Sequence, residues 1–331
     1  VLSMSDHQIR TVSSYDNKLQ PNKGQLPPPD LLNAEKTFEI YELLRQLLPV
    51  SSVVKSDYAN TVRDILDRVD GLILDGYGII NIGNRPTPEI TNFFAEILHR
   101  DIPFIILTNG ASFPSAQAAE KYKQWGLPIK QSDIISSRDV FESHLLEMPH
   151  QKILRLNLAT APLKNTEEVN SKIYTFEHSL KQADAFAFMG SVGWTERDQV
   201  LFESALRERP RPVFVANPDV SAPQEKGFSA EPGYWIARAM MQSEFPIKWF
   251  GKPHPASFEM AVKALQEKSG YKLDRSRIAM IGDSLHTDIL GANAAGLMSV
   301  LVTNYGLMRG LKVEKICRDT SIHPHIISPI L

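Results

Sequence analysis

Two carboxylates, a hydroxyl and a lysine stand at places where an α/β protein binds its ligands. Asp75, Thr108 and Asp283 each come at the end of a short apolar run, and Lys252 precedes a helical pattern. In a parallel sheet the carboxyl ends of the strands meet at one edge, and ligands bind there. The sequence therefore predicts that these groups lie together. Carboxylates at such an edge can act as nucleophiles or hold a cation.

Taken one at a time, these residues have ordinary explanations. An Asp after an apolar run is usually a turn residue or a helix N-cap, and Thr108-Asn109-Gly110 is common turn chemistry. Lys252 on its own would be a solvated surface lysine. Their combination, in this order along the chain, favours one shared site over a set of unrelated turns and caps.

The motifs around these residues resemble those of a known family. The segments 72–80, 107–109, 251–253 and 281–288 are similar to the four motifs of the haloacid dehalogenase (HAD) superfamily. The fourth is the most specific, and it reads Gly-Asp-Ser-x-x-Thr-Asp-x-x-Gly-Ala over 282–292. The segments Ala216-Asn217-Pro218-Asp219 and Gly251-Lys252-Pro253-His254-Pro255 resemble the NagD-like subfamily, in which a large α/β cap is inserted between motifs two and three. The resemblance extends over about residues 55–310.

This resemblance implies a Mg²⁺-dependent phosphatase that acts on a small phosphorylated metabolite. Asp75 would be the nucleophile and would form an aspartyl-phosphate, which divides the hydrolysis into two steps. Mg²⁺ prefers hard oxygen ligands in an octahedral arrangement. The resemblance implies that Asp75, the Tyr77 carbonyl and Asp283 supply them. Asp288 belongs to the same metal site, where it would orient water or Lys252.

The resemblance also implies how the substrate is held. Thr108 and nearby backbone N–H groups would bind phosphate oxygens, and Lys252 would neutralise both the phosphate and Asp75. In capped enzymes of this kind the cap selects the substrate and excludes water. The expected substrate-binding residues are Asn109, Gly110, Asn217 and Asp219. The Asn217-Pro218-Asp219 segment also fits an Asx-type turn that follows a strand.

Tyr77 departs from the family pattern. Most family phosphatases have Asp-x-Asp-Gly, in which the second Asp protonates the leaving group and then activates water, but this chain has Asp75-Gly76-Tyr77-Gly78. A tyrosine, with a pKa of about 10, can donate a proton but is a poor base at pH 7. The loss of an acid/base group costs about 10²–10⁴-fold in rate. Alkyl phosphates should therefore be hydrolysed slowly, and aryl or acyl phosphates should be affected less.

Two other functions compete with the phosphatase. Tyr77 also fits a regulatory protein that keeps the fold and binds a phosphorylated ligand without hydrolysing it. A dinucleotide-dependent dehydrogenase is disfavoured, because Gly76-Tyr77-Gly78 lacks the third glycine at the required spacing.

The apolar runs predict the elements that position these groups. A strand, a helix and a second strand over 71–75, 91–99 and 103–107 make a βαβ unit, which is typical of a parallel sheet. The late strands are expected at 278–283 and 299–303. The middle of the chain has its own apolar runs, at 152–156, 185–189 and 212–216. The predicted fold class is α/β, with a Rossmann-like core and a second α/β domain inserted as a cap.

The predicted organisation has a leader, an extension, a cap and a core in two parts. Residues 1–30 are polar and end in a proline run, which is typical of a flexible leader. Asp30 is expected to cap a helix over 31–48. The predicted segments are the leader 1–30, the helical extension 31–54, the first core part 55–141, the cap 142–245, and the second core part with the C-terminal tail 246–331.

Composition excludes several classes of function. The 331 residues include 36 Lys and Arg against 38 Asp and Glu, so there is no basic excess to favour nucleic acid or a membrane surface. No apolar stretch approaches the roughly 20 residues of a membrane span, and no apolar signal region begins the chain. The lone Cys317 cannot form an internal disulfide, which favours a reducing compartment. We therefore expect a cytoplasmic enzyme, and relatives of the NagD-like type often form homodimers through the cap.

Overall fold

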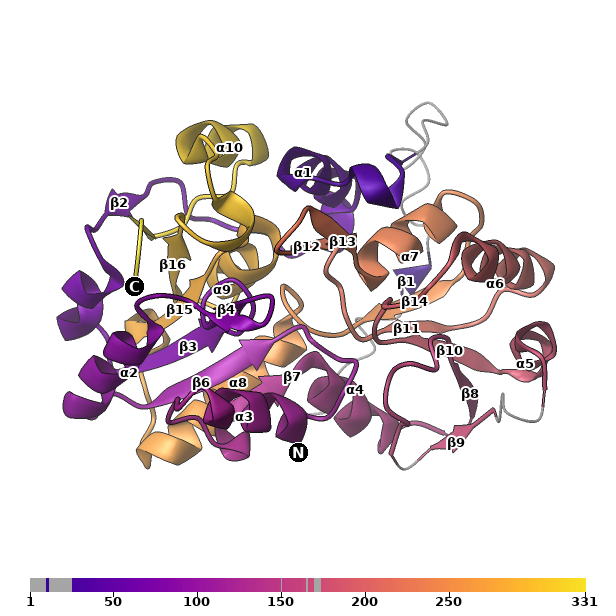
Figure 1. Ribbon diagram of the computed structural model, residues 1–331, viewed down its shortest axis with the longest axis horizontal. Coiled ribbons are helices and arrows are strands. Elements are labelled where there is room, and N and C mark those ends of the chain that lie inside the picture. The colour runs from indigo at the N-terminus through magenta and orange to yellow at the C-terminus, as the bar shows by residue number, and fades with distance from the viewer. Residues whose placement is uncertain (1–9, 12–25, 150, 165, 170–173) are drawn as a thin grey trace.

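The computed structural model describes residues 10–11, 26–149, 151–164, 166–169 and 174–331. They form two α/β lobes that lie side by side, a core and a cap (Figure 1). Most of the predicted leader 1–30 lies outside the described residues. Within the described ranges, no helix is long and apolar enough to cross a membrane.

The core is built on a seven-stranded parallel sheet in the order β2-β17-β16-β15-β3-β6-β7. Its central strands β3 and β15 are buried along their whole length, because helices cover both faces of the sheet. Leu72 and Leu74 pack on one face and Ile73 on the other. The strands are β2 (Asp57–Tyr58), β3 (Gly71–Asp75), β6 (Phe104–Thr108), β7 (Ile134–Ser136), β15 (Ile278–Gly282), β16 (Met298–Val302) and β17 (Ile326–Ser328).

Helices from both halves of the core cover this sheet. Phe93 of α2 packs in the cluster of Leu72, and Phe258 of α8 packs in the cluster of Ile73. The core helices are α2 (Ile90–His99), α3 (Ser115–Gln124), α4 (Ser137–Leu145), α8 (Pro255–Ser269), α9 (Leu290–Ala294) and α10 (Val313–Thr320). The predicted α/β fold with a Rossmann-like parallel sheet is confirmed.

The cap has its own sheet, in the order β1-β14-β11-β10-β8-β9, which is parallel except for β1. β14 belongs to this sheet, so residues 246–249 lie in the cap and not in the second core part, where the sequence placed them. α4 packs on α8 and β7 of the core, although the predicted cap began at 142. The elements are β1 (Arg10–Thr11), β8 (Lys152–Arg155), β9 (Glu167–Glu168), β10 (Ala185–Phe188), β11 (Val213–Val215), β14 (Pro246–Trp249), α5 (Phe176–Gln182), α6 (Glu196–Glu208) and α7 (Pro232–Met240).

Two small antiparallel hairpins come from opposite lobes. The core hairpin is β4 (Asn81–Ile82) with β5 (Arg85–Pro86), and the cap hairpin is β12 (Ser221–Pro223) with β13 (Phe228–Ala230). Arg85 and Glu225 form an exposed ion pair across them, with 4.0 Å between Nε and Oε1.

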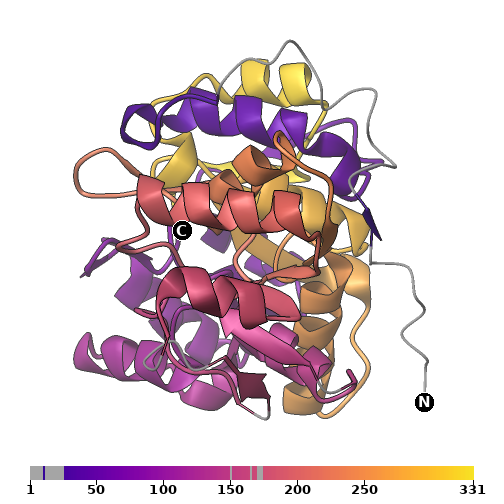
Figure 2. The ribbon, with the colours of Figure 1, turned by 90° about the vertical axis from the view of Figure 1, so that its right-hand side faces the viewer.

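The N-terminal extension forms a shorter helix than predicted. Helix α1 (Ala34–Leu43) is followed by a 3₁₀ turn over Arg45–Leu47. Its cap is Asn33, whose side chain accepts a backbone N–H of the first turn, and not Asp30. Asp30 lies inside a separate 3₁₀ turn, Pro29–Leu31, so its side chain is out of register with the start of α1. In Figures 1 and 2, α1 lies along the top of the molecule.

His144 lies where α4 of the core meets β14 of the cap. The Nζ atom of Lys248 is 3.1 Å from His144 Nε2, and the imidazole packs beside the Phe250 ring at 5.3 Å between centroids. Burial, and then the Lys248 ammonium, lower the pKa of His144 to about 4. The pKa of a histidine in an unfolded chain is about 6.5. This residue therefore contributes stability above pH 6.5, which is lost as the pH falls from 6.5 towards 4.

We predict that the His144→Gln variant loses part of this pH dependence. Glutamine can still accept a hydrogen bond from Lys248 but does not become protonated. Its Tm, measured by thermal denaturation from pH 7.5 to 4.5, should fall less than that of the unmodified protein. His99→Gln, at the exposed end of α2, is the control and should leave the slope unchanged. Equal slopes for both variants would contradict this assignment.

Candidate active site

The predicted site residues converge on one cavity between the core and the cap. The cavity has a volume of about 690 Å³. Asp75 and Thr108 end the neighbouring strands β3 and β6, and Asp283 directly follows β15, so all three lie at the carboxyl edge of the core sheet. The predicted residues that line the cavity are Asp75, Tyr77, Thr108, Asn109, Gly110, Asn217, Asp219, Lys252 and Asp283.

Lys252 joins two buried carboxylates at the base of this cavity. Its Nζ atom is 2.5 Å from Asp75 Oδ1 and 2.7 Å from Asp288 Oδ1. The Lys252 side chain is only 3% exposed. Asp75 Oδ1 also accepts a 2.7 Å hydrogen bond from the Gly76 amide. The lysine therefore holds the Asp75 carboxylate in one orientation and compensates part of its charge.

The titration behaviour of these groups follows from burial and from their mutual proximity. Burial, and then the Asp288 carboxylate, raise the pKa of Asp75 well above its usual range, and Lys252 opposes this rise. Burial alone would lower the pKa of Lys252, but Asp288 and Asp75 together raise it above the usual value. Lys252 therefore stays cationic between the two carboxylates.

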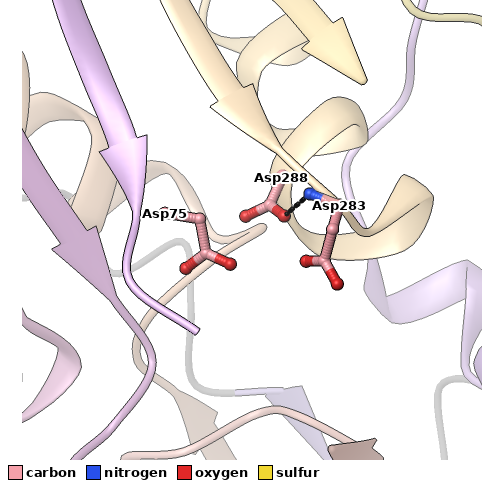
Figure 3. A group of neighbouring side chains, drawn as sticks. All are labelled: Asp75, Asp283 and Asp288. Atoms are coloured by element: carbon pink, nitrogen blue, oxygen red, sulfur yellow. Dashed lines mark hydrogen bonds between the residues drawn. The ribbon is translucent and has the colours of Figure 1, made fainter. Parts of the chain in front are cut away.

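Three aspartates form a cluster that suits a hard cation. Asp75, Asp283 and Asp288 each offer one oxygen, and these atoms lie within 4.8 Å of one another. Figure 3 shows the three side chains grouped together: Asp75 at the end of β3, Asp283 after β15, and Asp288 in the helical turn Leu285–Ile289. Asp288 Oδ2 accepts hydrogen bonds from the Asp283 and Ser284 amides, at 3.0 and 3.1 Å. An all-oxygen donor set of this kind fits Mg²⁺.

The loop around Asp283 is shaped by glycines that leave no room for a side chain. The Leu307 amide donates a 2.7 Å hydrogen bond to Asp283 Oδ2. A Cβ on Gly78 (φ +99°) or Gly306 (φ +60°) would collide with the Asp283 carboxylate. Both glycines also have backbone conformations that other residues rarely adopt. The close approach of the backbone holds the Asp283 side chain in one orientation. The Leu307 amide binds its Oδ2 atom and not its Oδ1 atom.

We predict that Gly306→Ala weakens metal binding by about 10- to 100-fold, the usual cost of disturbing groups that orient a metal ligand. The added methyl group would displace Asp283 from the Leu307 amide. Mg²⁺ titration calorimetry, with half-maximal activation as a second readout, measures the effect. Gly310→Ala is the matched control, because Gly310 also has a positive φ, of +76°, but nothing lies within 4 Å of its Cβ position. Equal Mg²⁺ affinities in the two variants would contradict the role of Gly306.

Asn109 connects the core motifs to the cap. Its Nδ2 atom donates to Asp219 Oδ1 at 2.8 Å and to the Lys252 carbonyl at 2.9 Å, and its Oδ1 accepts from the Lys252 amide at 2.7 Å. Asn217 Oδ1 accepts from the Asp219 amide, which is the Asx turn predicted for this segment. Burial raises the pKa of Asp219 to about 7, against the lowering effect of the Asn109 hydrogen bond.

The Tyr77 hydroxyl is engaged away from the aspartate cluster. It donates to the Pro223 carbonyl of the cap hairpin and accepts a 3.0 Å hydrogen bond from the Gly83 amide of the core hairpin. Burial raises the pKa of Tyr77, so the phenol keeps its proton at neutral pH. Tyr77 thus ties the two hairpins together. The metal-binding role of its backbone carbonyl stays a prediction.

Some cavity residues were not identified from the sequence. Tyr41 comes from α1, Glu231 directly precedes the cap helix α7, and Leu307 provides the amide for Asp283. For Gly306 the sequence offered one indication of a role in the site, because this residue follows the strand pattern of β16 at the same edge of the sheet. Tyr41 had none, because α1 lies far from every motif in sequence.

Comparison with known proteins places this geometry in a family context. A family model described as haloacid dehalogenase-like hydrolase matches residues 72–170, and a second, described as HAD-hydrolase-like, matches residues 249–327. The acid sugar phosphatase of Staphylococcus haemolyticus is 23% identical over 251 residues, which is 70% of this chain and 84% of that protein.

Solved structures share the fold. A possible sugar phosphatase from Cytophaga hutchinsonii has a TM-score of 0.69 and 24% identity, and the match covers 83% of this chain and 98% of that one. NagD from E. coli K-12 has a TM-score of 0.56 and 19% identity, with 79% of this chain and 96% of that chain covered.

Proposed function

On the premise that this chain belongs to the haloacid dehalogenase-like hydrolases and is a phosphatase of the NagD type, we propose that it hydrolyses a small phosphorylated metabolite through an aspartyl-phosphate on Asp75. The observation that supports this most directly is the buried Lys252, which bridges Asp75 and Asp288 beside Asp283. The cavity of about 690 Å³ that Asp75, Lys252 and Asp283 line accommodates a small ligand.

The first step is attack of the Asp75 carboxylate on phosphorus. The P–O ester bond breaks as the Asp75–phosphate bond forms, and the leaving oxygen takes a proton. Lys252 neutralises charge on the nucleophile and on the phosphate oxygens. The Thr108 hydroxyl lies at the end of the neighbouring strand, in the same cavity, and would bind a phosphate oxygen.

The second step is hydrolysis of the acyl phosphate. Water attacks phosphorus, inorganic phosphate leaves, and the Asp75 carboxylate is restored. Mg²⁺ held by Asp75, Asp283 and Asp288 would compensate charge on the phosphate oxygens in both steps, most of all in the first, where an anionic nucleophile meets an anionic phosphate. Asp288 also holds Lys252 in place.

Tyr77 limits which leaving groups are suitable. With its hydroxyl held by Pro223 and Gly83, Tyr77 is not directed at the leaving oxygen, so this proton comes from solvent. Aryl and acyl phosphates, whose leaving groups need less protonation, are therefore the better substrates.

Phosphate release tests the proposal. Purified protein is assayed on p-nitrophenyl phosphate, acetyl phosphate and a panel of sugar phosphates, with Mg²⁺ or with EDTA, beside an Asp75→Asn variant. We expect Mg²⁺-dependent turnover of the first two that the variant lacks. If the unmodified protein releases no more phosphate than the variant on every compound, the proposed activity is wrong.

The engaged Tyr77 hydroxyl also supports a second function, in which the protein binds a phosphorylated ligand and does not hydrolyse it. That function predicts a rise in Tm with a phosphorylated metabolite and Mg²⁺, with no phosphate released over hours. Measuring Tm and phosphate in the same samples separates the two functions.

A further inference from the structure

Helix α1 packs against both lobes at once. Ala34 and Phe38 lie in a cluster with Leu285 and Ile289 of the core. These two core residues belong to the segment 283–289, which carries Asp283 and Asp288 and is called the metal-site loop below. Other residues of α1 pack into the cap cluster. Its members there are Ile40, Tyr41 and Leu44, together with Tyr234, Trp235 and Ile236 of α7. Helix α1 lies outside both segments matched by the family models.

Tyr41 reaches from α1 into the catalytic cavity. Its side chain is 3% exposed and lines the cavity together with Asp75 and Asp219. The Tyr41 hydroxyl accepts a 3.1 Å hydrogen bond from the buried Val220 amide. Val220 directly follows Asp219, so this bond fixes the backbone of the cap loop 217–221.

The other side of the Tyr41 ring contacts the metal-site loop. The ring stacks on His286 at 4.9 Å between centroids and 9° between planes. His286 lies between Asp283 and Asp288, and its Nε2 atom is 2.7 Å from Glu42 Oε1, also of α1. One tyrosine therefore touches the cap loop with its hydroxyl and the metal-site loop with its ring.

Thr37 makes a second link one turn earlier on α1. Its Oγ1 atom lies 2.6 Å from Ser221 Oγ of the cap loop, and both side chains are buried. Residues 37 and 41 share one face of the helix because they are four positions apart. This face thus holds the cap loop at two neighbouring points, Val220 and Ser221.

We propose that Tyr41 is a positioning residue of the active site, which holds the cap loop 217–221 in register with the loop that carries Asp283 and Asp288. This proposal rests on the proposed function and extends it. In the proposed function the phosphoryl group is held by Lys252 and Thr108 of the core, and the cap loop adds Asn217 and Asp219 to the lining of the same cavity. Tyr41 therefore governs binding of the leaving group rather than transfer of the phosphoryl group.

The Tyr41→Phe variant tests this role with the least disturbance. Phenylalanine keeps the ring that stacks on His286 but leaves the buried Val220 amide without its acceptor. We expect KM for p-nitrophenyl phosphate to rise about fivefold or more, the cost of losing one buried acceptor, with kcat little changed. For acetyl phosphate, which presents little beyond the phosphoryl group, KM should stay within about twofold. Thr37→Val should shift the same ratio in the same direction.

Tyr234→Phe is the matched control. The Tyr234 hydroxyl also joins the N-terminal segment to the cap, through a 2.8 Å hydrogen bond to the Pro27 carbonyl, but it does not bind the 217–221 loop. Its KM ratio between the two substrates should equal that of the unmodified protein. Equal losses on both substrates in Tyr41→Phe, or a ratio the same as in Tyr234→Phe, would overturn the proposal.

Thermal-shift measurements on the same variants separate the role of Tyr41 from the proposed phosphatase function. If the unmodified protein hydrolyses neither substrate, the proposed phosphatase function fails, and the role of Tyr41 is then read from ligand-induced Tm shifts. Tyr41→Phe should reduce the shift caused by p-nitrophenyl phosphate and keep the shift caused by inorganic phosphate. The positioning role would be refuted if Tyr41→Phe changed both Tm shifts equally, or if neither ligand shifted the Tm of the unmodified protein.

Discussion

The Asp75→Asn variant is expected to lose phosphatase activity by on the order of 10⁴-fold or more, as is usual when a covalent nucleophile is removed. An amide nitrogen or oxygen cannot attack phosphorus as the carboxylate does. The variant should nevertheless keep its structure. The amide oxygen of the substituted side chain can still accept from the Gly76 amide and from Lys252, and Lys252 keeps Asp288 as an anionic partner.

Stability provides an internal check on this result. Because burial raises the pKa of Asp75, loss of its charge should leave the Tm unchanged or higher. Asp133→Asn is the matched control. Asp133 is also buried and pairs with a lysine, Lys268, at 2.7 Å, but it does not line the cavity. This control should keep full activity. An active Asp75→Asn protein would rule out the covalent mechanism.

The Tyr77→Asp variant is expected to gain activity on alkyl phosphates by about 10²-fold, within the range that a positioned acid/base group contributes. A carboxylic acid near Asp75 and Asp283 would have a raised pKa, since like charges and burial disfavour its ionised form. It could then donate a proton to a poor leaving group and accept one from water. Glycerol phosphate and p-nitrophenyl phosphate, assayed in parallel, measure the selectivity of the gain.

Tyr77→Asn is the control for the lost tyrosine. Both variants remove the hydroxyl that bonds to Pro223 and Gly83, so both loosen the contact between the hairpins. Only the aspartate restores a titratable group. The gain should therefore appear in Tyr77→Asp alone and should be larger for glycerol phosphate than for p-nitrophenyl phosphate. Equal rates in the two variants would show that Tyr77 is not at the acid/base position.

The central elements of the core could be predicted because their sequence signals are local. Continuous apolar runs indicated the buried strands β3, β6, β15 and β16, and the polar residues after three of them, Asp75, Thr108 and Asp283, indicated the edge of the sheet where ligands bind. The cap strands β8, β10 and β11 also lie on the apolar runs found at 152–156, 185–189 and 212–216. For these elements the apolar pattern and the tertiary environment agree.

The features that could not be predicted from the sequence depend on contacts between distant segments. β14 has the composition of an ordinary strand, and only its pairing with β11 places it in the cap sheet. The start of α1 was misplaced because Asp30 and Asn33 are both good caps, and the choice depends on local backbone geometry. Tyr41 belongs to the site only because α1 lies between the lobes. Likewise, the direction of the Tyr77 hydroxyl is set by Pro223 of the cap.

The neighbouring strands β3 and β15 have a consequence for biosynthesis. They pair side by side at the centre of the sheet, yet the cap strands β8 to β14 lie between them along the chain. During synthesis from the N-terminus, the cap strands β8 to β14 leave the ribosome before β15 exists. The cap can therefore fold first, and one edge of β3 stays unpaired until β15 has been made. Asp75 meets Asp283 only after synthesis has passed β15, so a nascent chain that ends before β15 cannot be enzymatically active.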